Sequence, residues 1–176
     1  MGRGILEVLL VDEEGIKDNH KCILGCLNWL NPCKNARKPY VCVQYGNQQR
    51  LSCVAKRGSD RKRIWNEKFT FEVEYPDLGL GDEEQPQYKL IFRVMNKHKF
   101  SKDEFLGEAR IHVKDILSLG MEKGRYEVRH QKYRVVELDK TYSGDISAVI
   151  TFIKIGKGED IASCKSSDIQ ANKIVI

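Results

Sequence analysis

Two clusters of reactive side chains stand out in this sequence, and each suggests a different chemistry. The first combines one imidazole with three thiols: His20, Cys22, Cys26 and Cys33. Thiolates and imidazoles are preferred ligands of Zn²⁺, but structural zinc sites use close cysteine pairs, which this spacing lacks. We therefore predict no metal site in this cluster, and no lipid-modified cysteine.

The second cluster is the densest basic run in the chain. Five cations fall within eight residues: Lys56, Arg57, Arg61, Lys62 and Arg63. Guanidinium and ammonium groups bind phosphate oxygens, so the run suits an anionic lipid, a phosphoinositide or an RNA backbone. A solvated loop has the same composition, and the sequence leaves these interpretations open.

Catalytic chemistry finds no comparable support. The chain has no Gly-x-Ser-x-Gly turn, no Walker phosphate loop and no His-Glu-x-x-His zinc motif. The acidic stretch at 82–84 is typical of a solvated loop, and no nucleophile pattern accompanies the four histidines, His20, His98, His112 and His130. We therefore predict a binding protein and not an enzyme.

Length and composition favour one folded domain. The chain has 176 residues, of which 41% are hydrophobic and 31% charged, which excludes a polytopic membrane protein and a wholly disordered one. The net charge of +5 permits an anionic partner but does not require one. No signal-peptide pattern is present, so the six cysteines are expected to be reduced thiols, and we predict a cytoplasmic location, peripheral at membranes.

The elements that must position these residues are short alternating segments separated by turns. Eight segments have the alternation of strands: 5–11, 39–45, 50–55, 65–75, 88–94, 106–113, 126–136 and 145–153. The helix that the pattern favours is short, at about 113–119. The pattern predicts an all-β fold, an eight-stranded antiparallel β-sandwich over residues 1–155. The tail, 156–176, lacks periodicity and is expected to be flexible.

Several of these segments together resemble the C2 domain family. They are Gly4–Val8, the strand that Pro39-Tyr40-Val41 opens, Trp65–Phe71, Val94-Met95 and Glu104–Ala109, so that the likeness covers about residues 4–154. More narrowly, segments 65–76, 113–120, 131–133 and 141–144 resemble small single-domain plant C2 proteins of the sixteen-kilodalton phloem-protein type. The resemblance implies a C2-like sandwich with three functional loops at one end, acting as a binding module.

The resemblance also places the calcium positions of the family on unsuitable residues. Calcium-dependent members hold the ion with loop aspartates, and the corresponding positions here are His20, Lys38, Asn96, His98 and Glu104. Ca²⁺ takes six to eight oxygen ligands, whereas only Glu104 offers a carboxylate here and Lys38 adds a repelling charge. We therefore predict that calcium binding is lost and that the protein uses no cofactor.

A fixed cation at such a loop can take over the ion's role toward lipid. Each Lys or Arg near an anionic leaflet contributes roughly 1 kcal/mol. We therefore expect Lys38, Lys97, Lys99 and Lys102 to give calcium-independent contact with an anionic phospholipid membrane or a protein partner, with no small-molecule substrate. Two alternatives stay open: a protein-interaction scaffold without lipid affinity, and an RNA-binding, cell-to-cell trafficking protein, which the phloem-protein resemblance implies.

The first loop carries a long insertion, at about 18–38. Ile23, Leu24, Leu27 and Leu30 have the spacing of one face of a short helix, with Trp29 beside them. An exposed helix of this kind would insert Trp29 and Leu30 at the membrane interface. Alternatively, these side chains fold back onto the sandwich.

Overall fold

The structure is a computed structural model that describes residues 2–16, 37–59, 62–75 and 88–156. Most of the predicted insertion and nearly all of the predicted tail lie outside these residues. Within them the chain forms one helix, α1 (Lys114–Lys123), and nine strands: β1 (Gly2–Glu14), β2 (Pro39–Tyr45), β3 (Gln48–Leu51), β4 (Lys56–Arg57), β5 (Arg63–Tyr75), β6 (Lys89–Asn96), β7 (Glu104–His112), β8 (Arg125–Val136) and β9 (Tyr142–Ile155).

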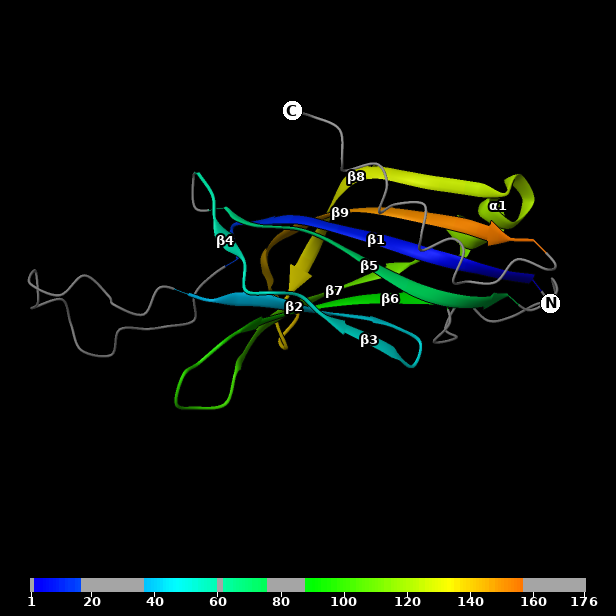
Figure 1. Ribbon diagram of the computed structural model, residues 1–176. Coiled ribbons are helices and arrows are strands. Elements are labelled where there is room, and N and C mark those ends of the chain that lie inside the picture. Colours follow the sequence, from blue (N-terminus) through cyan, green and yellow to red (C-terminus); the bar gives the residue numbers. More distant parts are fainter. Residues whose placement is uncertain (1, 17–36, 60–61, 76–87, 157–176) are drawn as a thin grey trace, which may run out of the picture.

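The strands follow one hydrogen-bonded order, β3-β2-β6-β7-β8-β9-β1-β5-β4, and every pairing is antiparallel. This long sheet curls over so that β3-β2-β6-β7 faces β8-β9-β1-β5-β4 (Figure 1). The two halves share one residue pair, Glu108 with Val136, between β7 and β8. The predicted all-β antiparallel sandwich is confirmed. Of the segment expected as a strand at 50–55, only residues 50 and 51 belong to a strand, the end of β3, and the ninth strand, β4, begins after it at Lys56.

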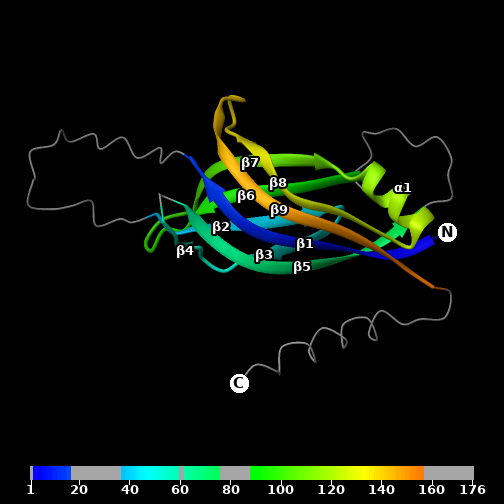
Figure 2. The same ribbon diagram turned by 90° about the horizontal axis from the view of Figure 1, so that it is seen from above.

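The core lies between the two halves and follows from the alternation of each strand. Side chains of β1, β5 and β9 face those of β2 and β6, and the largest fully buried ones include Phe71, Phe92 and Phe152. The helix α1 closes one end of this core with Ile116 and Leu117 (Figure 2). The apolar side chains spaced two apart in the sequence are thus sufficient to define the two inner faces.

A bulge in β1 changes which carboxylate points inward. Leu6, Val8 and Leu10 are buried, so strict alternation would bury Asp12 next. Against β9, Leu10 pairs with Ala148 and Asp12 with Ser147, so β1 carries one extra residue here, and the fully buried residue is Glu13 instead. An extra residue in one strand has this effect because it moves every later side chain to the other face.

The connections that carry most of the predicted contact residues lie at one end of the molecule. The end of β1, the start of β2, β4 and the turn between β6 and β7 lie at the left of Figure 1, opposite α1 and the start of β1. We call this the loop end, and residues 97–103, between β6 and β7, the third loop.

Candidate functional site: the loop end of the sandwich

Three of the predicted calcium positions meet at the base of the third loop. Asn96 ends β6 and is buried, and Glu104 begins the neighbouring strand, β7. The Asn96 amide nitrogen lies 3.3 Å from a Glu104 carboxylate oxygen, and His98 Nε2 lies 3.4 Å from the same oxygen. The three side chains therefore use their polar atoms on one another.

Lys38 joins this cluster through its backbone. Its N–H donates to Asn96 Oδ1 at 3.0 Å, and its carbonyl accepts from the Lys97 N–H at 3.0 Å. The backbone is thus fixed, whereas the side chain of Lys38 is exposed. The acidic position that precedes Pro39 in calcium-dependent members is here a cation beside the cluster.

These described residues do not fit a calcium ion. The Asn96 side-chain oxygen already accepts a backbone N–H, and the Lys38 side chain carries positive charge. In the described part of the chain, no group of three or more His, Cys, Asp or Glu side chains is arranged to hold a metal ion. Loss of calcium binding stays a prediction, because His20, the first-loop position, lies outside the described residues.

The acidic residue of the third loop, Asp103, is held by two hydrogen bonds. The Tyr40 hydroxyl donates to it at 2.7 Å and the His98 N–H at 3.1 Å. The Tyr40 hydrogen bond is the main reason that the pKa of Asp103 lies below its ordinary value, with smaller contributions from the His98 N–H and the Lys97 charge. The same hydrogen bond raises the pKa of Tyr40 to about 12, so the hydroxyl stays a donor.

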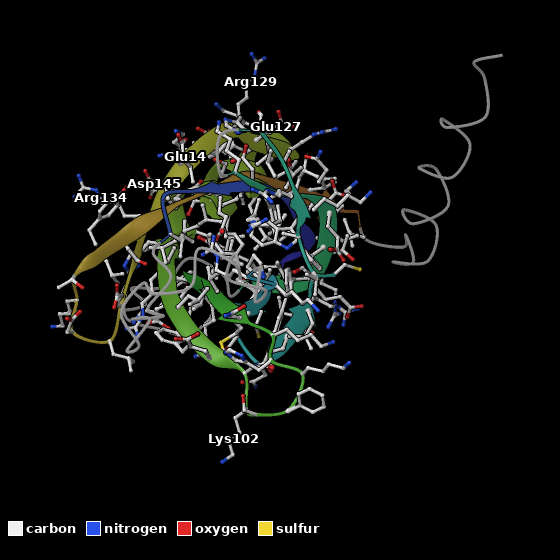
Figure 3. All side chains as sticks on the ribbon, turned by 90° about the vertical axis from the view of Figure 1, so that its left-hand side faces the viewer. Glu14, Lys102, Glu127, Arg129, Arg134 and Asp145 are labelled. Carbon is white, nitrogen blue, oxygen red and sulfur yellow. The ribbon has the colours of Figure 1, made fainter. Side chains whose placement is uncertain are left out.

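The tip of the third loop presents an apolar ring among cations. The side chain of Phe100 is 91% exposed, and Lys97, Lys99 and Lys102 are exposed around it. Figure 3, which views the loop end, shows Lys102 projecting away from the body of the domain. We predicted these lysines as contacts from the sequence but missed Phe100, for which the signal was an aromatic residue between lysines in a loop.

A buried ion pair lies where the first loop returns to the sheet. The Arg37 guanidinium, which directly precedes Lys38, contacts the Glu13 carboxylate, and their side chains are 6% and 0% exposed. No local pattern distinguishes Glu13 from its acidic neighbours, since the β1 bulge that turns it inward is a tertiary feature.

Family motifs position the loops beside this site. The Trp65 indole N–H donates to the Cys53 carbonyl at 3.1 Å, and Glu67 accepts the Cys53 N–H at 2.9 Å. Asn66 between them has a φ of 49°, a conformation that Asn tolerates better than most residues. The Trp-Asn-Glu sequence thus makes a bend in β5 that holds the segment following β3.

Comparison with known proteins agrees with this arrangement. The C2 domain family model matches residues 12–128. The chain belongs to the C2 domain family. It is 42% identical over 161 residues to elicitor-responsive protein 1 of Oryza sativa subsp. japonica, an alignment that covers 92% of this chain and 91% of that protein. It is 38% identical over 152 residues to 16 kDa phloem protein 1 of Arabidopsis thaliana, covering 86% of each.

Solved C2 structures share the fold. A C2 domain-containing protein from a putative elicitor-responsive gene aligns with a TM-score of 0.59 at 25% identity, over 91% of this chain and 97% of that one. A C2 domain of plant extended synaptotagmin 1 aligns with a TM-score of 0.57 at 16% identity, over 87% and 96%. No helix among the described residues is long and apolar enough to cross a bilayer.

The structure places the basic run of this C2 domain along β4 and the start of β5. Lys56 and Arg57 are exposed on β4. Lys62 lies 3.7 Å from the Glu14 carboxylate, and Arg63 is half-buried. Arg61 lies outside the described residues, as do the predicted membrane contacts Trp29 and Leu30. The described cations of the run thus do not form one uniform surface.

Strand β8 carries a second set of cations, which we did not predict. Arg129 is exposed, Lys132 pairs with Glu14 at 2.8 Å, and Arg134 lies 6.0 Å from the centre of the Tyr142 ring. In Figure 3, Arg129 projects at the top of the view and Arg134 at the left, whereas Lys102 lies at the bottom. Uncharged residues and His130 separate these cations in the sequence, so they are less conspicuous there than the run at 56–63.

Proposed function

We propose that this C2 protein is a calcium-independent binding module that contacts anionic phospholipid membranes, as a peripheral protein on the cytoplasmic side. The contact is the loop end, with Phe100 as the inserted side chain and Lys38, Lys97, Lys99 and Lys102 as the cations. The observation that carries the proposal is the 91% exposure of Phe100 at a tip surrounded by exposed lysines. An isolated exposed ring needs no explanation, but a ring within a cationic tip has the composition of an interfacial anchor.

The expected strength is modest. Four lysines contribute roughly 4 kcal/mol on an anionic leaflet, and burial of one phenylalanine adds about 2 kcal/mol. A total of about 6 kcal/mol corresponds to a Kd between the millimolar and micromolar ranges. The binding is therefore expected to be reversible and to weaken with salt, since much of it is electrostatic.

Sedimentation with phosphatidylserine vesicles tests the proposal, once with Ca²⁺ and once with a chelator. We expect equal binding in both conditions, and loss of binding in the Lys38→Glu/Lys97→Glu double variant. The matched control is Lys114→Glu/Lys123→Glu, which makes the same change of charge on α1 at the opposite end (Figure 1). Binding that needs Ca²⁺, or that both double variants weaken equally, would overturn the proposal.

A second candidate function, RNA binding, is favoured by the exposed cations on β4 and β8. Lys56 and Arg57 are exposed on β4, Arg129 and Arg134 are exposed on β8, and Tyr142 beside Arg134 is 51% exposed. An exposed aromatic beside a guanidinium suits base stacking. If the exposed cations of β8 bind RNA, the Arg129→Glu/Arg134→Glu variant should retain less single-stranded RNA on a filter. The Lys38→Glu/Lys97→Glu variant should retain nearly as much as the native protein. The reverse result argues against this candidate.

A further inference from the structure

A surface pocket of about 270 Å³ lies beside the base of the third loop. One wall is formed by Leu51, which ends β3, and by the residues that follow it, 52–54. The opposite wall is formed by Tyr40, Lys97 and Asp103. Its volume is below the roughly 300–1,000 Å³ of pockets for drug-sized ligands, so it suits a small group and not a whole lipid.

Both walls are held in place by hydrogen bonds. Trp65 and Glu67 fix the backbone of Cys53 on one side. On the other side, the Tyr40 hydroxyl and the His98 N–H fix the Asp103 carboxylate. A pocket whose walls are fixed in this way loses little conformational entropy when a ligand enters.

The pocket holds two opposite charges that no ion pair joins, although the Lys97 charge contributes to the lowered pKa of Asp103. Lys97 and Asp103 both line it, and neither makes an ion pair within 4.0 Å with any described residue. Each carboxylate oxygen of Asp103 accepts one hydrogen bond and has capacity for a second. The pocket therefore has a site for a cation and a site for an anion within one small volume.

We propose that this pocket binds a phosphate that carries a primary ammonium two carbons away, the chemistry of the phosphatidylethanolamine headgroup. The ammonium donates to Asp103, the phosphate pairs with Lys97, and the two methylenes pack on Leu51 and Val54. This inference rests on the proposed membrane binding, because the ligand reaches the pocket on a bilayer into which Phe100 inserts.

Other headgroups match the two charges less well. A choline nitrogen has no N–H to donate to Asp103, so it loses the charge-assisted hydrogen bond. The additional carboxylate of a serine headgroup lies close to Asp103 and is repelled by it. An anion without an amine, such as phosphoglycerol, leaves the Asp103 charge uncompensated.

Vesicle binding tests this selectivity at constant membrane charge. Two vesicle types with the same phosphatidylglycerol content are compared, one filled with phosphatidylcholine and the other with phosphatidylethanolamine. We expect about tenfold tighter binding to the ethanolamine vesicles, the size of one charge-assisted hydrogen bond. Ethanolamine lipids also loosen the packing of a bilayer, but a preference from that source would persist in any variant that keeps Phe100.

Asp103→Asn separates the two explanations. Asparagine removes the charge but keeps one oxygen, which can accept from the His98 N–H, while its NH2 group can donate to the Tyr40 oxygen. We expect this variant to lose the ethanolamine preference and to bind phosphatidylglycerol vesicles at least as tightly as the native protein, since the loop becomes more cationic. Asp139→Asn, the same change in the turn between β8 and β9, is the matched control and should retain the preference. A preference that Asp103→Asn retains would overturn the proposal.

An experiment with soluble headgroups tests the pocket independently of the proposed membrane binding. O-phosphoethanolamine and phosphocholine are titrated separately into the labelled protein, and the amide shifts of Cys53, Val54 and Lys97 are followed by NMR. Saturable shifts with phosphoethanolamine alone support the pocket even if vesicles are not bound. Vesicle binding with no ethanolamine preference and no such shifts leaves the proposed function standing and overturns the pocket. Absence of both vesicle binding and shifts overturns both.

Discussion

Arg37 and Lys38 are neighbours in the chain, but the fold gives them opposite environments. Arg37 is 6% exposed and paired with the buried carboxylate of Glu13, whereas Lys38 is exposed beside the third loop. The first cation is positioned to stabilise the fold, and the second is exposed to solvent, where the proposed function uses it. The cations of this C2 domain thus include some that are buried in ion pairs and others that are exposed. Variants of each kind separate effects on folding stability from effects on binding.

The largest effect is expected from Arg37→Met. This change leaves Glu13 buried without its guanidinium, and loss of one member of a buried pair costs about 3–5 kcal/mol of unfolding free energy. Urea unfolding followed by circular dichroism measures it. Lys38→Met is the control and should shift the unfolding free energy by no more than about 0.5 kcal/mol. A loss below about 1 kcal/mol in Arg37→Met would contradict a structural role for the pair.

The next effect concerns two exposed apolar side chains, Phe100 in the third loop and Leu138 in the turn between β8 and β9, which are 91% and 85% exposed. Phe100→Ser should weaken binding to phosphatidylserine vesicles about tenfold or more, because burial of one such side chain contributes about 1.5–3 kcal/mol. Leu138→Ser should change it less than about twofold, since acidic residues flank Leu138 and disfavour contact with an anionic surface. Equal losses in a flotation assay would show that the membrane contact is broader than the third loop.

The smallest effect is expected from Lys99→Gln alone. One lysine near an anionic leaflet contributes roughly 1 kcal/mol, so binding should fall about fivefold at low salt and less at high salt. The unfolding free energy should be unchanged, in contrast to Arg37→Met. A salt series of vesicle sedimentation measures this, and a loss that does not depend on salt would argue against an electrostatic role for Lys99.

The sequence was sufficient for most of the fold, because alternating strands leave few ways to bury their apolar faces. The Trp-Asn-Glu and Phe-Leu-Gly motifs also located the loop end correctly. Gly107 shows why the second motif is so informative: a Cβ there would lie 2.6 Å from Val135 Cγ1 and 2.9 Å from the Val136 carbonyl oxygen, where β7 approaches β8. Only glycine fits this approach without displacing the neighbouring strand.

The parts that sequence reasoning missed depend on tertiary geometry. Glu13 turns inward because of a bulge in β1 opposite β9, which no local sequence pattern predicts. The cations of β8 lie within six residues of one strand, and they are available to a partner only because the fold leaves their side chains exposed. The pocket at Tyr40 and Asp103 exists because residues 63 positions apart are joined by a hydrogen bond. Phe100 differs from these, since its neighbouring lysines were noted and its own exposure was overlooked.

The pairing of β1 with β9 has a mechanical consequence. Arg3 lies opposite Ile155, so the two ends of the described fold are adjacent, at the end of the molecule opposite the third loop (Figure 1). Tension applied between residues 3 and 155 separates β1 from β9 in an unzipping geometry, in which the hydrogen bonds between the two strands are loaded one after another. The domain should therefore yield to such a pull at low force, whereas tension between the third loop and either end would load many of those bonds at once.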